Sequence, residues 1–191
     1  MPFYTKAALR EQYQRTGYER QYKSASSILR EAKERPSYNF FLSHSYLDAK
    51  EIVSLRDDIS SMGFSVYVDW LEDTHLDRNK VTQATAEVLR GRMRQCDAML
   101  YAFSTNSSVS RWMPWEAGYF DALKTRVAIL PVFDVDPRNE RFRGEEYLGL
   151  YPYVLKDPIA STRQDTLWVM LDQTTYVDAS SWLKGSQPTK H

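Results

Sequence analysis

The chain has 191 residues, of which 25 are basic and 25 acidic, so its formal net charge is zero. Hydrophobic residues make up 42% of the chain, which is enough for the core of one globular domain with an additional element. The sequence has no basic stripe of the kind nucleic-acid binders use, and no apolar run of roughly 18 residues that could span a membrane.

The single cysteine, Cys96, cannot form an internal disulfide, which suits a reducing compartment. The N-terminal residues show no apolar run of the kind a signal peptide requires, so we expect a cytoplasmic protein. The three histidines do not fall at metal-ligand spacing with one another or with Cys96, and we expect no metal site. The glycines form neither the dinucleotide fingerprint nor the phosphate-binding P-loop.

Residues 1–36 are predicted to form an N-terminal helical extension. Apolar residues such as Leu9, Tyr13 and Leu29 recur among many charges in residues 4–35. Gly17 is expected to divide this segment into two helices, and Pro36 to end it.

Residues 37–184 alternate strand and helix patterns, and residues 185–191 are expected to form a flexible tail. The predicted strands cover residues 39–43, 64–70, 97–104 and 127–132. Of the runs 147–155 and 167–171, one is predicted to be the fifth sheet strand and the other an edge strand. The predicted helices cover residues 46–62, 81–92 and 114–124, with a short closing helix at Trp182 and Leu183.

Strands that alternate with helices favour a parallel sheet covered on both faces. In such a sheet, ligands bind at the carboxyl ends of the strands. This rule selects three loops, at residues 43–48, 69–80 and 104–116.

The third of these loops ends in an unusual stretch, "SRWMPWEAGYF", in which two tryptophans surround Glu116. One interpretation is structural, because a carboxylate in the first turn of a helix stabilises the helix dipole and buried tryptophans usually pack. The functional interpretation is that a carboxylate beside aromatic rings stabilises an oxocarbenium-like sugar while a flat base stacks nearby. Glu116 has no second carboxylate close in sequence, so a two-carboxylate glycosidase would need Asp69 or Asp77 from the second loop.

The segments "FFLSHSYLDAKEIVSLRDDISSMGFSVYVDW" and "SRWMPWEAGYF" resemble the TIR domain (Toll/interleukin-1 receptor homology). In the second segment Trp112 stands four residues before Glu116, and this spacing is similar to that of the catalytic glutamate in TIR-type NAD⁺-cleaving enzymes. The resemblance covers residues 37–132. The later "EYLGLYPYVL" and "SSWL" are similar to bacterial TIR proteins of the Thoeris anti-phage system.

The resemblance implies a flavodoxin-like fold, with a parallel five-stranded sheet in the order 2-1-3-4-5 behind the N-terminal extension. It also implies cleavage of the nicotinamide–ribose bond of NAD⁺, which would be a substrate rather than a cofactor. Glu116 would be the catalytic residue, and the substrate-binding residues would be Ser43, His44, Ser45, Trp70, Arg78 and Trp112. The product is left open among linear, cyclic and conjugated ADP-ribose.

The resemblance also implies partners for this protein. They are self-assembly through TIR–TIR contacts, a phage-derived activator, and an effector protein reached through the product, with no nucleic acid or membrane.

Two alternatives to the enzyme remain open. A TIR domain can act as a non-catalytic scaffold, because fold alone does not determine function. A receiver-type domain is disfavoured, because the first strand lacks paired acidic residues at its end. The "SHS" of residues 43–45 lacks the GxSxG elbow of a hydrolase, Asp48 is predicted to cap a helix, and Cys96 is predicted to be buried.

Overall fold

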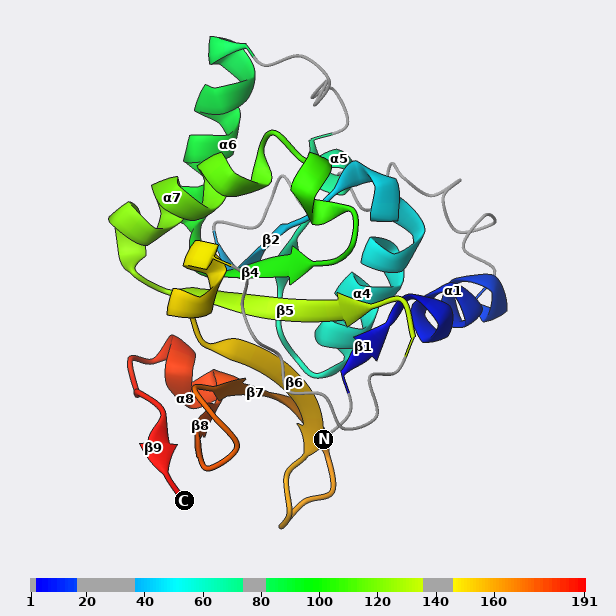
Figure 1. Cartoon of the computed structure of the whole chain (residues 1–191), viewed down its shortest axis with the longest axis vertical. Coiled ribbons are helices and arrows are strands. Elements are labelled where there is room, and N and C mark those ends of the chain that lie inside the picture. The colour runs from blue at the N-terminus through cyan, green and yellow to red at the C-terminus, as the bar shows by residue number, and fades with distance from the viewer. Residues whose placement is uncertain (1–2, 17–36, 74–81, 136–145) are drawn as a thin grey trace.

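A mixed sheet runs through the middle of the molecule (Figure 1). The computed structural model describes residues 3–16, 37–73, 82–135 and 146–191. Within these residues the strand order is β3-β2-β4-β5-β6-β7-β8-β9, and β1 pairs with β5. The strands are β1 (Tyr4–Thr5), β2 (Tyr38–Ser43), β3 (Val66–Tyr67), β4 (Cys96–Phe103), β5 (Val127–Phe133), β6 (Tyr153–Pro158), β7 (Asp165–Met170), β8 (Thr175–Asp178) and β9 (Thr189–Lys190).

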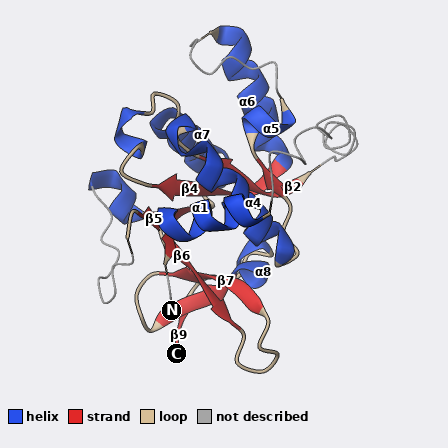
Figure 2. Ribbon diagram, turned by 90° about the vertical axis from the view of Figure 1, so that its right-hand side faces the viewer, coloured by secondary structure: helices blue, strands red, loops and turns tan. Residues whose placement is uncertain are grey.

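The helices cover both faces of the parallel part of this sheet, and α1 lies beside α4 (Figure 2). The helices of the described residues are α1 (Lys6–Arg15), α4 (Ala49–Ser61), α5 (Asp69–Glu72), α6 (Gln83–Gln95), α7 (Met113–Lys124) and α8 (Ala179–Leu183), the last of which packs against the antiparallel strands β7 and β8. Short 3₁₀ turns in the described part of the chain lie next to strands, at η2 (Tyr46–Asp48), η3 (Ser107–Val109) and η4 (Glu146–Leu150). No helix among the described residues is long and apolar enough to cross a membrane.

Alternation along the central strands divides the core into two parts. On β4, Ala98 and Leu100 join the core under α1 and α4, whereas Met99 and Tyr101 join the core under α6 and α7. Successive side chains of a strand point to opposite faces, so a residue's parity fixes which helices it meets. The prediction of a mostly parallel α/β sheet covered on both faces is confirmed, since β3, β2, β4, β5 and β6 pair in parallel.

The sheet is larger than the predicted five strands. β7, β8 and β9 extend it antiparallel beyond β6, so the run at 167–171 is not an edge strand. A tight turn, in which the Ile159 N–H donates to the Gln164 carbonyl at 2.9 Å, joins β6 to β7 as a hairpin. The C-terminal residues were expected to be loose, but Thr189 and Lys190 pair with β8 and the His191 ring stacks on Tyr176.

The N-terminal extension also differs from the prediction. Tyr4 and Thr5 form a strand beside Val132 and Phe133 of β5, and the Thr5 hydroxyl then caps α1 by accepting from the Ala8 N–H. The helix from Lys6 to Arg15 agrees with the sequence, and residues 17–36 lie outside the described part of the chain. The second predicted strand is shorter than expected, because helix α5 begins at Asp69 directly after it.

Candidate active site

Glu116 lies in the first turn of α7 and is completely buried, with 0% of its surface exposed. Trp112 is the N-cap residue of this helix and Pro114 lies in its first turn, where a missing N–H costs nothing. The backbone N–H of Glu116 donates to the Trp112 carbonyl at 2.8 Å, as in a regular α-helix. The four-residue spacing read in the sequence is therefore one helical turn.

The Ser43 hydroxyl donates a 2.6 Å hydrogen bond to Oε2 of Glu116. Ser43 is the last residue of β2. Because side chains alternate along a strand, Ser43 lies on the same face as Phe41, which is the face that α7 covers. Tyr101 of β4 is its register partner on the same face. Burial, the Tyr147 hydroxyl and the charge of Glu116 raise the pKa of Tyr101, so this neighbour stays a neutral phenol. The sequence marked Tyr101 only as a strand residue.

His44 points the other way, toward the start of α5. Its Nδ1 lies 2.9 Å from the Leu42 carbonyl, and its Nε2 accepts a 2.9 Å hydrogen bond from the indole N–H of Trp70. A carbonyl only accepts and an indole only donates, so these contacts fix the neutral tautomer with the proton on Nδ1. Asp69 Oδ1 lies 3.7 Å from the same Nε2. Ser43 and His44 thus contact different partners and do not form a hydrolase pair.

The segment that follows β3 is anchored by hydrogen bonds to the buried Asp73 carboxylate. Arg92 donates two hydrogen bonds of 2.8 Å to the Asp73 carboxylate, and the Tyr67 hydroxyl donates a third at 2.7 Å. These bonds join α6 to the segment that follows β3. Side-chain hydrogen bonds therefore hold the second predicted loop at Asp73, while Asp77 and Arg78 lie outside the described residues.

Trp112 is 6% exposed and belongs to the core under α6 and α7. Its ring meets Trp115 edge-on at 5.4 Å, and Trp115 stacks on Tyr119 at 5.8 Å. The Arg90 guanidinium lies 5.5 Å from the Trp115 ring centre. The aromatic residues around Glu116 therefore form one continuous packed group.

The two remaining polar residues of the first loop have separate partners. The Ser45 hydroxyl accepts from the Leu47 N–H at 3.4 Å and starts the η2 turn. Asp48 occupies the N-cap position of α4, but its side chain makes no capping bond. It accepts instead from the Ser104 hydroxyl and from the Asn106 amide, across the edge of the sheet. The prediction that Asp48 caps the helix is wrong for this reason.

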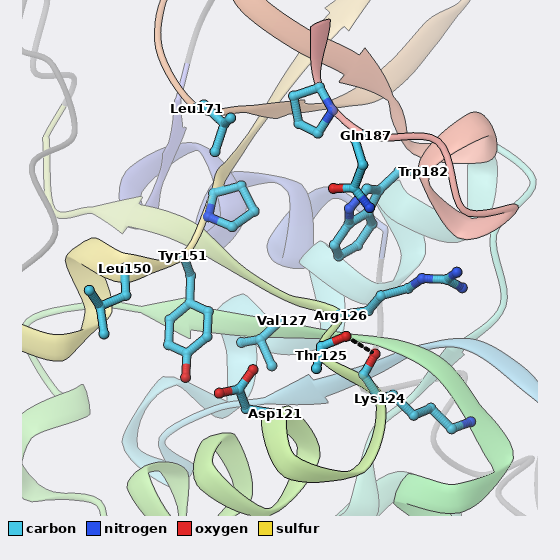
Figure 3. Close-up of a pocket in the computed structure, with 12 residues that line it drawn as sticks. Asp121, Lys124, Thr125, Arg126, Val127, Leu150, Tyr151, Leu171, Trp182 and Gln187 are labelled. Carbon is cyan, nitrogen blue, oxygen red and sulfur yellow. Dashed lines mark hydrogen bonds between the residues drawn. The ribbon is translucent and has the colours of Figure 1, made fainter.

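A cavity of about 470 Å³ lies at the opposite end of α7 from Glu116 (Figure 3). It is formed where the end of α7 and the start of β5 meet η4 and the C-terminal elements, with Asp121, Tyr151 and Trp182 in its wall. Lys124 and Arg126 also line it, and both donate to backbone carbonyls. None of the predicted site residues that the structure describes lines this cavity.

The candidate site thus combines a buried carboxylate at the start of α7 with the carboxyl ends of β2 and β4. A parallel α/β sheet with polar residues at the carboxyl ends of its strands agrees with the TIR domain that the sequence resembles. No family model matches the chain. The chain belongs to the family of ThsB′-type TIR proteins of the Thoeris system, as one relative that is similar over most of both chains shows.

One relative, from Bacillus cereus (strain MSX-D12), is named "Probable 3' cyclic ADP-D-ribose synthase ThsB'". It is 47% identical over 165 residues, which are 84% of this chain and 85% of the relative. A second, from Cytobacillus dafuensis, is named "Putative cyclic ADP-D-ribose synthase TIR2". It is 32% identical over 83 residues, which are 43% of this chain and 22% of that protein.

Proposed function

We propose that this protein cleaves the nicotinamide–ribose bond of NAD⁺ and closes the ADP-ribose into a 3′ cyclic product that acts as a signal in anti-phage defence. The observation that carries the proposal is the buried Glu116 carboxylate held by Ser43. The relative that covers most of the chain supports the product, because its name states a 3′ cyclic ADP-D-ribose synthase.

Cleavage of this bond leaves positive charge on the anomeric carbon of the ribose as neutral nicotinamide departs. A carboxylate kept from bulk water stabilises such a charge more strongly than one in solvent. Glu116 has that environment, and the Ser43 hydroxyl holds one of its oxygens in place. We assign the stabilisation of the transition state to Glu116.

The second step forms the new bond. A ribose hydroxyl of the same molecule attacks the anomeric carbon and loses its proton, which gives a cyclic product, whereas water would give linear ADP-ribose. Exclusion of water from the site favours the first outcome. NAD⁺ is consumed in this scheme, so it is a substrate and not a bound cofactor.

The predicted substrate contacts stay part of the proposal. Ser43, Ser45, Trp70, Arg78 and Trp112 are assigned to the walls of the NAD⁺ site. His44 is assigned to the same site through Trp70, because both of its nitrogens already have partners.

We also propose that the protein works after a trigger. Glu116 is completely buried, so NAD⁺ reaches it only after covering side chains move aside. A phage-derived activator or self-assembly would supply the free energy for that movement, and the product would then act on a separate effector protein. Exposed apolar residues on the loops after β2, β4 and β5 support self-assembly at this edge, namely Tyr46, Leu47, Val109 and Val135.

The experiment is incubation of the purified protein with NAD⁺, alone and with lysate from phage-infected cells, followed by liquid chromatography and mass spectrometry. We expect free nicotinamide and a product with the mass of ADP-ribose less one water. Glu116→Gln keeps the shape of the side chain and removes its charge, and it should lower turnover by about 100-fold or more. Full turnover by this variant would show that Glu116 is not the catalytic residue.

A further inference from the structure

A buried lysine connects the N-terminal helix to the candidate active site. Lys6, the first residue of α1, is only 3% exposed. Its ammonium group lies 3.1 Å from Asp48 and 3.3 Å from Asp134, and it donates to the Thr105 hydroxyl at 2.9 Å. These three partners follow β2, β4 and β5, so one side chain joins the loops at three neighbouring strand ends.

Asp48 also contacts the loop after β4. Its two oxygens accept hydrogen bonds from Ser104 and Asn106, the second at 2.6 Å. Asp48 is 3% exposed, and Lys6 is the cation that balances its charge. Removing either partner leaves the other charge buried.

The same two segments are also joined at the candidate active site. Ser43 lies five residues before Asp48, and the loop that begins at Ser104 leads through η3 to the start of α7, where Glu116 lies. The Ser43–Glu116 bond therefore ties the end of β2 to α7, and the Asp48–Ser104 bond ties the turn after β2 to the β4–α7 connection.

We propose that Lys6, acting through Asp48, is a positioning residue of the active site, which holds the β4–α7 connection at the distance from β2 that Glu116 requires. This inference rests on the proposed NAD⁺ cleavage. It gives the N-terminal extension a part in the reaction, since a displacement of about 1 Å at a reacting group can cost about 100-fold in rate.

The test compares the buried Lys6 with the half-buried Lys156. Lys6→Met removes the cation beside the site. Lys156→Met is the control: Lys156 lies on β6, away from the site, and its ammonium group pairs with Asp58 of α4 at 2.7 Å. Both variants are assayed under activating conditions at a temperature where circular dichroism shows them folded. We expect Lys6→Met to lower kcat by about 10- to 100-fold with little change in KM, and Lys156→Met to leave kcat near that of the wild type. A kcat for Lys6→Met no lower than that for Lys156→Met would overturn the proposal.

Two further measurements keep the inference testable. If Lys6→Met does not fold, Ser104→Ala removes only the hydrogen bond to Asp48. This variant should lower kcat several-fold with KM unchanged, and an unaltered kcat would overturn the proposal.

Hydrogen exchange of the folded variant is independent of activity, and it should show faster exchange in residues 104–112 for Lys6→Met but not for Lys156→Met. If the wild type does not cleave NAD⁺, the proposed function fails, while unchanged exchange in residues 104–112 would overturn the positioning role separately.

Discussion

Ser43 and Glu116 are 73 residues apart in the sequence, and a 2.6 Å hydrogen bond joins their side chains. The contact depends on the position of Ser43 at the end of β2, where its parity directs the hydroxyl toward α7. A shift of one residue would place His44 there and turn Ser43 toward Trp70. The register of the sheet therefore decides which side chain meets the carboxylate.

Loss of the Ser43 hydroxyl should reduce the reaction rate. A hydrogen bond to a charged group contributes about 1.5–3 kcal/mol, so Ser43→Ala should lower kcat by about 10- to 100-fold. Ser65→Ala is the matched control, because Ser65 makes comparable hydrogen bonds to Asn39 beside β3. The measurement is nicotinamide release by chromatography. Equal rates for the two variants would remove Ser43 from the mechanism.

Trp70→Phe should destabilise the protein through His44. The substitution keeps an aromatic ring but leaves the buried Nε2 of His44 without its donor, at a cost of about 1–3 kcal/mol. Trp168 donates to the Asp157 carbonyl at a half-buried position, so Trp168→Phe should cost less. The free energy of unfolding from urea titration checks this prediction. A smaller loss for Trp70→Phe than for Trp168→Phe would contradict it.

Asp57 should make folding less favourable at neutral pH. Burial raises its pKa from 3.8 to about 6, so the folded protein binds the proton more tightly than the unfolded chain. The charged carboxylate therefore lowers stability above about pH 6, and this penalty disappears as the pH falls to about 4. Because the side chain is 35% exposed, solvent screening limits the effect to about 1 kcal/mol.

The corresponding variant is Asp57→Asn. It should be more stable than the wild type at pH 7.5 and equally stable near pH 4, as measured by urea titration at both values. Greater stabilisation at the lower pH would have the opposite sign from that expected of a carboxyl group with a raised pKa.

Cys96 should be unreactive in the folded protein. The side chain is completely buried at the start of β4, and burial raises the pKa of its thiol. Ellman's reagent at pH 8 should therefore titrate no thiol in native protein and one in denaturant, where the single cysteine becomes exposed. Rapid reaction in the native state would mean that β4 opens at its amino end.

Local patterns predicted the α7 start well because their causes are local. Pro114 in the first turn and the spacing of Trp112 and Glu116 fix a helix start without reference to the rest of the chain. Asp48 shows the opposite case. The neighbouring residues predicted a capping bond, but the carboxylate accepts hydrogen bonds from Ser104 and Asn106, which are distant in the sequence. The strand at 167–171 was predicted, but its place inside the sheet and the strands β8 and β9 were missed for a related reason, since short alternating runs do not specify which neighbour they pair with.

The sequence by itself determined that strands and helices alternate and that a carboxylate begins the helix after the third predicted strand. These features follow from side-chain periodicity and helix-end chemistry, which act over a few residues. Only the tertiary structure decided that Ser43 holds Glu116, that Trp70 fixes the tautomer of His44, and that Lys6 joins the strand ends. Each of those contacts links distant segments, and the packing of the whole sheet sets their distances.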